Sequence, residues 1–229
     1  MHSLYPPSAP PGYVGKLQLN RGPALHGHYQ PIEFKGAPWL LLAWADQGQF
    51  SDYRQVPVTL GVMVAPVYRF KVTGIPGNED AAVYPTVEVI DRLYAPPGME
   101  AKFPIPIEIT VEDLRLALSG NYITRVIYVE DPDQALPFVS DPNHPQWFDA
   151  GSKTDPLAEA DRLGRPVAIL RIGGRQPDER LGPDHQFLYG CPPLVVFGPR
   201  QAPPPEAVNV APIMADNNSR LVPQPSVRR

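Results

Sequence analysis

The chain lacks most of the features from which a reaction or a cofactor is inferred. Cys191 is the only cysteine among its 229 residues, which excludes an intrachain disulfide and leaves no set of thiolates for a metal. There is no Gly-x-Gly-x-x-Gly motif, no Gly-Lys-Ser/Thr phosphate loop, no Gly-x-Ser-x-Gly turn and no His-Glu-x-x-His pair. These absences favour a protein that is not an enzyme and that binds no cofactor.

Charge and long apolar runs are also scarce. Charged residues make up 19% of the chain, the formal net charge is −4, and the only adjacent basic pair is Arg228-Arg229. Because nucleic-acid binding normally needs a basic patch, we expect no nucleic-acid partner. The longest apolar run, residues 38–45, is far shorter than the roughly 20 residues that span a bilayer, so no direct membrane span is expected. Removal of a signal peptide and a lipid anchor both remain open.

Proline is abundant, with 32 residues in two populations. One population is clustered in segments without apolar periodicity, and the other stands singly between apolar runs. Proline fixes φ and donates no backbone hydrogen bond, so it opposes helix interiors and central strands. The sequence predicts a β-sandwich-like body at 29–198 between two extended, proline-rich arms at 1–28 and 199–229.

Alternating apolar residues mark the strands of this body. The alternation is clearest at 58–64, 67–73, 86–94 and 122–129, and the apolar run at 38–45 predicts a strand with Trp39 and Trp44 in the core. Pro104 and Pro106 indicate an edge strand. Thr110 and Asp155 can each cap a short helix that ends at a glycine. The fold class is therefore mainly β, with antiparallel strands and one or two short helices.

The segment 130–154 is a long irregular loop with several carboxylates and aromatic rings. Calcium binds six to eight oxygen atoms from such loops, which makes Asp131, Asp133 and Asp141 candidate ligands. Asp-Pro pairs also start ordinary turns, so a plain loop is the competing interpretation. Trp147 and Phe148 are candidate contacts with a partner or a glycan, unless their rings fix the loop to the core.

Two further clusters are open to a chemical and a structural interpretation. His26 and His28 lie two residues apart, as a copper or zinc pair can, but no third ligand is near in sequence. Cys191 has His185 as its only nearby candidate base. For the thiol, packing as a small buried side chain is the favoured alternative.

The arms carry isolated aromatic and aliphatic side chains that can enter the grooves of a neighbouring subunit. We expect partner contacts at Tyr5, Tyr13, Leu17, Ile213 and Leu221, in addition to Trp147 and Phe148.

Three β-rich passages of the chain are YPTVEVIDRL at 84–93, FPIPIEIT at 103–110 and YITRVIYVEDP at 122–132. Together they resemble uncharacterised cell-envelope proteins of planctomycete-type bacteria. The resemblance implies a secreted or lipid-anchored, β-rich surface protein, and it brings no functional residue with it.

The sequence thus predicts a non-catalytic structural or accessory subunit of a larger extracytoplasmic bacterial assembly, docking on other protein subunits through its arms. The alternative is a glycan-binding or calcium-dependent adhesion module that uses the 130–154 loop. A hydrolase with an unfamiliar site is the third interpretation.

Overall fold

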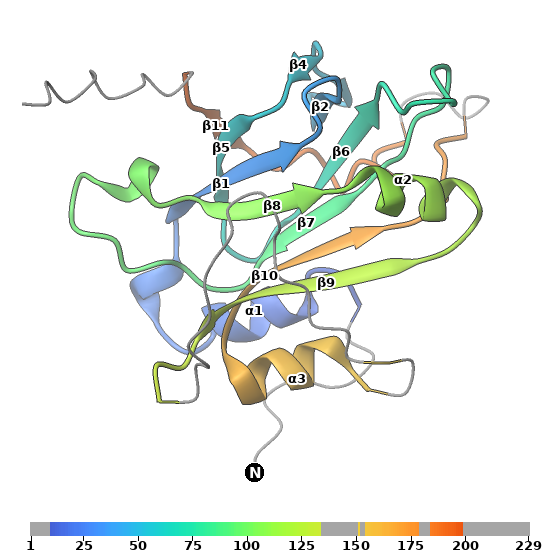
Figure 1. Ribbon diagram of the computed structural model, residues 1–229. Helices are drawn as coiled ribbons and strands as arrows, with labels where there is room; N and C mark the ends of the chain where they lie inside the picture. Colours follow the sequence, from blue (N-terminus) through green and yellow to red (C-terminus); the bar gives the residue numbers. More distant parts are fainter. Residues whose placement is uncertain (1–9, 134–150, 152–153, 179–183, 199–229) are drawn as a thin grey trace, which may run out of the picture. The chain divides into compact units, whose positions relative to one another are not determined.

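A computed structural model describes residues 10–133, 151, 154–178 and 184–198 (Figure 1). Residues 1–199 form one compact unit and residues 200–229 a second, and all the described residues belong to the first. Within the described ranges, 11 strands form two sheets and three α-helices accompany them. The mainly β fold class that the sequence predicts is confirmed.

The smaller sheet has four strands in the order β11-β5-β1-β8. Its strands are β1 (Tyr29–Gly36), β5 (Val58–Met63), β8 (Ile105–Ile109) and β11 (Leu194–Val196). Ile32 of β1 is paired with Leu60 of antiparallel β5 and with Ile105 of β8, which runs parallel to β1. Strand β8 is an edge of this sheet, as Pro106 within it and Pro104 just before it predict.

The larger sheet has seven strands, which pair antiparallel throughout. Their order is β3 (Gln49–Phe50), β2 (Leu41–Asp46), β6 (Val67–Thr73), β7 (Thr86–Val89), β10 (Gly164–Ile172) and β9 (Ile123–Glu130), with β4 (Arg54–Gln55) also paired to β2. Because neighbouring strands are in register, the side chains of directly paired residues share one face of the sheet.

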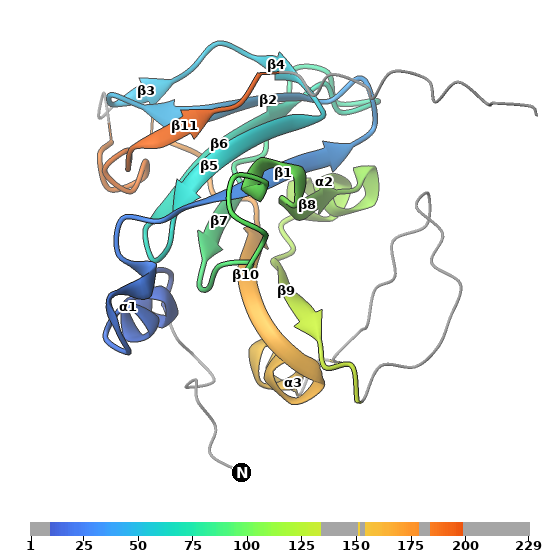
Figure 2. The same cartoon turned by 90° about the vertical axis from the view of Figure 1, so that its left-hand side faces the viewer.

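The hydrophobic core lies between the two sheets (Figure 2). Phe34 of β1 and Phe70 of β6 are in contact across it, with ring centroids 4.5 Å apart. Alternate residues of both sheets contribute to the same cluster, among them Leu60 and Leu170. The larger sheet therefore has an inner face toward this core and an outer face that is covered by other segments.

Helices α2 (Val111–Leu118) and α3 (Pro156–Leu163) begin where the sequence predicts. The Thr110 hydroxyl accepts the amide of Asp113, and the Asp113 carboxylate accepts the amide of Thr110, which completes a local capping box. Asp155 accepts the amide of Leu157 at the start of α3. None of the helices among the described residues has the length and apolarity needed to cross a membrane.

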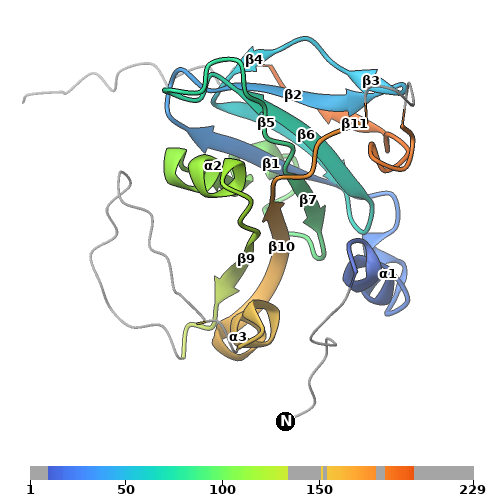
Figure 3. The same ribbon diagram turned by 90° about the vertical axis from the view of Figure 1, so that its right-hand side faces the viewer.

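The N-terminal arm differs from its predicted form. The sequence predicts an extended arm up to residue 28, whereas Tyr13–Leu19 form helix α1 and Pro23–Leu25 form the 3-10 helix η1. Val14 of α1 packs with Leu157 of α3 and Ile169 of β10 on the outer face of the larger sheet (Figure 3). A second 3-10 helix, η2, spans Glu100–Lys102.

One strand assignment from the sequence is also wrong in its bounds. The strand expected at 38–45 begins only at Leu41, because residues 37–40 form a turn closed by the Leu40 amide and the Ala37 carbonyl, 3.0 Å apart. Trp39 stands in that turn and is exposed, while Trp44 is buried.

Gly15 is expected to resist substitution although alanine is the better helix former. A Cβ atom at Gly15 would lie 2.4 Å from the Cα of Ala65, so α1 would have to move away from the sheet. We expect Gly15→Ala to lower the free energy of unfolding by about 1–3 kcal/mol, measured by urea denaturation. Gly22→Ala is the matched control, because no atom lies within 4 Å of its added Cβ. Equal stability of the two variants would contradict the close packing.

Candidate functional site

The outer face of the larger sheet carries a fully buried carboxylate, that of Glu88, with an exposure of 0%. Glu88 lies on β7 opposite Val67 of β6 and Ile169 of β10. Its Oε2 accepts the amide of Gly12 at 2.9 Å, and its Oε1 accepts the amide of Gly15 at 3.0 Å. The Arg171 guanidinium donates to Oε2 at 3.0 Å. A charged carboxylate can be buried this deeply only because each of its oxygens accepts a hydrogen bond.

These contacts make Glu88 the cap of helix α1. Gly12 is the N-cap residue and Gly15 is the third helical residue, and neither has a side chain that can accept a hydrogen bond. A capping box satisfies the same two amides with two local side chains. In α1 one carboxylate from a distant strand provides both acceptors, and its negative charge also suits the positive end of the helix.

Arg69 holds a second segment on the same face. Arg69 is paired with Thr86 of β7, and Thr86 is paired on its other side with Arg171 of β10, so the three side chains share the outer face. Arg69 is buried; its Nε donates to the Phe187 carbonyl at 3.0 Å and its Nη1 to the Tyr84 carbonyl at 2.6 Å. The guanidinium lies 4.4 Å from the Phe187 ring centroid. Burial lowers the pKa of Arg69, and the carbonyl and ring contacts replace the water that it has lost.

Tyr68 ties the inner face to the segment before β11. Its hydroxyl accepts the amide of Met63 at 2.9 Å and donates to the Pro193 carbonyl at 2.9 Å. Burial raises the pKa of Tyr68 to about 12, although the hydrogen bond from Met63 opposes this shift. The side chain therefore connects β6, β5 and the segment at Pro193 through one neutral hydroxyl group.

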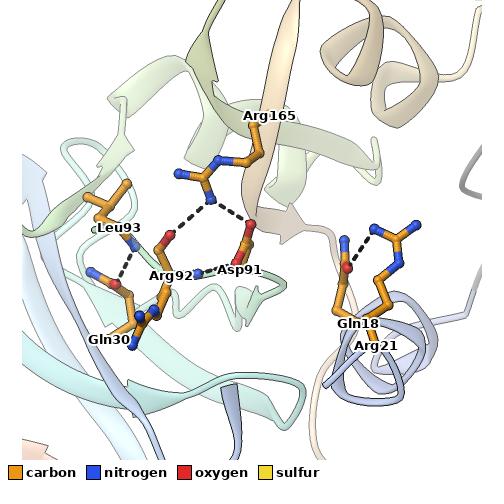
Figure 4. Close-up of polar contacts among 7 residues, drawn as sticks. All are labelled: Gln18, Arg21, Gln30, Asp91, Arg92, Leu93 and Arg165. Carbon is orange, nitrogen blue, oxygen red and sulfur yellow. Dashed lines mark hydrogen bonds and ion pairs between the residues drawn. The ribbon is translucent and has the colours of Figure 1, made fainter. Parts of the chain in front are cut away.

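A further polar network joins β1 to the segment after β7 (Figure 4). Gln30 accepts the Leu93 amide at 2.7 Å, and Arg165 donates to the Asp91 carboxylate at 2.5 Å and to the Arg92 carbonyl at 2.9 Å. The exposed Tyr94 ring has the guanidinium of Arg92 at 4.6 Å and that of Arg165 at 5.3 Å from its centroid. The Arg165 guanidinium thus has polar partners on the segment after β7, whereas the buried Nε of Arg92 has no hydrogen-bond partner among the described residues. Arg165 also lines a surface hollow with Asp131, Asp161 and Arg162.

A shallow hollow of about 510 Å³ lies beside α1. Helix α1, the 26–27 segment, the turn between β5 and β6 and the 189–192 segment line it. Lys16, His26 and Tyr189 are its main polar side chains. A ring nitrogen of His26 is hydrogen-bonded to the Leu19 carbonyl at 3.0 Å. The described residues that line the hollow include no serine, threonine or cysteine that His26 could activate.

Of the three predicted calcium ligands, the structure describes Asp131 and Asp133. Asp131 and Asp133 form a local turn in which the Asp133 amide donates to Asp131 Oδ1 at 3.1 Å, and Asp141 lies outside the described residues. No group of three His, Cys, Asp or Glu side chains that could hold a metal ion occurs in the described part of the chain. His26 and His28 therefore belong to no such group among the described residues.

Cys191 lies half-buried beside the cluster of Ala45, Phe187 and Leu188. Its Sγ accepts the amide of Gly48 at 3.3 Å. That contact joins the 184–191 segment to the turn between β2 and β3, which fits the packing interpretation of this thiol.

Only two of the predicted partner-binding residues lie in described parts of the structure. Tyr13 is exposed and Leu17 is half-buried, both on α1. Tyr5, Trp147, Phe148, Ile213 and Leu221 fall outside the described residues. The prediction of partner contacts at these positions stays a prediction.

Sequence reasoning missed Glu88, Arg69 and the exposed pair Trp39 and Tyr53. Glu88 alternates with buried valines, so its position in the strand predicts a solvent-facing carboxylate. The one available signal is the pair of glycines at 12 and 15. Neither can cap the start of a helix with its own side chain, so an acceptor from elsewhere in the chain is needed.

Comparison with protein-family models, with curated proteins and with solved structures gives no match to this chain. Its function therefore has to be argued from its own residues.

Glu88→Gln is expected to detach helix α1. The amide group of glutamine can accept at only one atom, and Arg171 loses its counter-charge inside the protein. Breaking a buried pair in this way costs about 3–5 kcal/mol, measurable by urea denaturation. Hydrogen exchange at residues 13–19 should accelerate more than exchange in the sheet.

Glu159→Gln is the matched control for this variant, because Glu159 pairs with Arg162 on the exposed side of α3. We expect little change in its stability. Equal stability of the Glu88 and Glu159 variants would show that the buried carboxylate does not anchor α1.

The raised pKa of Tyr68 predicts a loss of stability at high pH. The tyrosine is neutral when protonated, and its pKa is about 12 when folded against 10.0 for the unperturbed group. Its contribution is fully present below pH 10 and is lost as the pH rises toward 12. Unfolding measured between pH 8 and 12 should show this decline in the wild type and a smaller decline in Tyr68→Phe. Parallel curves for the two proteins would contradict it.

Proposed function

We propose that the protein is a non-catalytic structural or accessory subunit of a larger extracytoplasmic bacterial assembly. It docks on other protein subunits through its proline-rich N- and C-terminal segments. The two sheets around one core fit a sandwich-like body that serves as the rigid part of such a subunit.

The observation that carries the proposal is the attachment of α1 through Glu88. Residues 12–15 are fixed to the sheet by two hydrogen bonds from backbone amides to a buried carboxylate. The segment that precedes Gly12 therefore starts from a defined point on the body, and Tyr13 is exposed next to that point. A defined base reduces the orientational freedom that a docking segment loses on binding.

The buried ionic groups support the same proposal. Glu88 pairs with Arg171, and Asp113 pairs with Arg125 at 2.6 Å while it also caps α2. Each of these charges joins two structural elements. Among the described residues, the exposed large hydrophobic side chains are mostly aromatic, the type that dominates the energetics of protein interfaces.

Native mass measurement tests the proposal. The chain, expressed at its natural level and extracted under mild conditions, should migrate as a complex much larger than the monomer. Deletion of residues 1–9 or of residues 200–229 should reduce that mass, and the melting temperature of the truncated protein should stay close to that of the full chain because the compact unit is retained. A monomer in every preparation would contradict the proposal.

A further inference from the structure

The hollow beside α1 has a mostly apolar lining with few polar groups. Its volume of about 510 Å³ falls within the roughly 300–1,000 Å³ of small-molecule sites. The apolar side chains that line it come from α1, from the turn between β5 and β6 and from the 189–192 segment, and they include Leu19, Met63, Val67 and Pro192. Such a lining suits a ligand with a large apolar part and a single polar group.

The walls of this hollow are held in place by contacts within the described chain. Helix α1 lies against the turn between β5 and β6 (Figure 2), so closely that a Cβ at Gly15 would be 2.4 Å from the Cα of Ala65. The Ala65 amide donates to the Val89 carbonyl at 2.9 Å, which fixes the turn to β7. In the 189–192 segment, the Tyr189 ring has the Arg69 guanidinium 5.0 Å from its centroid. A ligand that enters walls of this kind loses little free energy in organising them.

The charges around the hollow are positive. Lys16 lines it and is exposed, and none of the ion pairs among the described residues involves its ammonium group. Arg69 adds a second cation behind the Tyr189 ring. The lining that the structure describes contains no aspartate or glutamate, and the nearby carboxylate of Glu88 is fully buried and paired with Arg171. An anionic group beside Lys16 is therefore attracted without opposition from the lining.

We propose that this hollow binds an alkyl carboxylate, that is, a small acid with a hydrocarbon chain. The carboxylate group lies beside the Lys16 ammonium, and the chain lies against the apolar lining. The inference is independent of the proposed function, because its ligand is a small molecule and not another subunit.

A hydrocarbon chain fits this lining better than a peptide does. Each residue of a peptide brings an amide and a carbonyl that need partners once water is displaced. The described lining offers three polar side chains, Lys16, His26 and Tyr189, and a ring nitrogen of His26 is already bonded to the Leu19 carbonyl. An alkyl carboxylate has one polar group for one cation, and each fully buried methylene raises the affinity by up to about fourfold.

Titration of the full-length chain with sodium decanoate, below the concentration at which it forms micelles, tests the inference. Backbone amide resonances of Lys16, Gly27 and Val67 should shift in proton–nitrogen correlation spectra and should saturate. Lengthening the probe from octanoate to decanoate should raise the affinity by about two- to fourfold per methylene. Added salt should weaken the binding of decanoate but not that of decanol, which has the same chain without the charge.

Lys16→Gln removes the charge and retains good helix propensity, so the fold should be unaffected. The affinity for decanoate should fall by about three- to fivefold, as the loss of one exposed ion pair implies. Lys35→Gln is the matched control, because Lys35 is an exposed lysine on β1 that does not line the hollow, and it should leave the affinity unchanged.

Any one of four results would overturn the inference. These are no saturation with decanoate, equal affinity of the wild type and Lys16→Gln, resonance shifts confined to residues away from the hollow, or tighter binding of a peptide that ends in leucine than of decanoate. None of them changes the mass of the native complex, so failure here leaves the proposed function standing.

Discussion

The position of the N-terminal segment depends on one buried carboxylate. Glu88 needs its three partners because an unpaired ion is not stable away from water, and the partners need Glu88 in return. The amides of Gly12 and Gly15 have no other acceptor at the helix start, and Arg171 is buried beside them. The sheet register also depends on this cluster, since a shift of β7 by one residue would turn Glu88 into the apolar core.

The two faces of the larger sheet are used differently. The inner face packs apolar side chains into the core, whereas polar side chains on the outer face bond the backbone of the segments that cover it. Glu88 holds the segment of α1, and Arg69 holds the carbonyls of Tyr84 and Phe187. The first turn of a helix and a segment without regular structure both leave backbone groups unsatisfied unless side chains supply the partners. The polar residues of the outer face supply them.

Helices α1 and α2 show what the sequence can and cannot reveal. The cap of α2 is local, with Thr110 and Asp113 three residues apart, so its start is visible in the sequence. The cap of α1 is supplied from a residue 73 positions beyond Gly15, and no local pattern reports it. In the same way, the alternation of apolar and polar residues locates the strands at 58–63 and 67–73. This alternation is the same for a glutamate that faces solvent and for one that a helix covers in the folded protein. Trp39 and Trp44 share one apolar run, and only the turn at 37–40 separates their environments.

The two described ends of the body are fastened in comparable ways, and this bears on how a docking subunit has to be built. At the N-terminal end, Glu88 bonds the backbone of residues 12 and 15. At the C-terminal end, Tyr68 bonds the Pro193 carbonyl and β11 pairs with β5. Any segment that binds a neighbour transmits strain to the point where it leaves its own body. Attachment through buried, geometrically fixed hydrogen bonds transmits that strain to the sheets. Binding of a terminal segment then does not break the contacts that attach the segment to the body. Such fastening fits a subunit that works through its terminal segments.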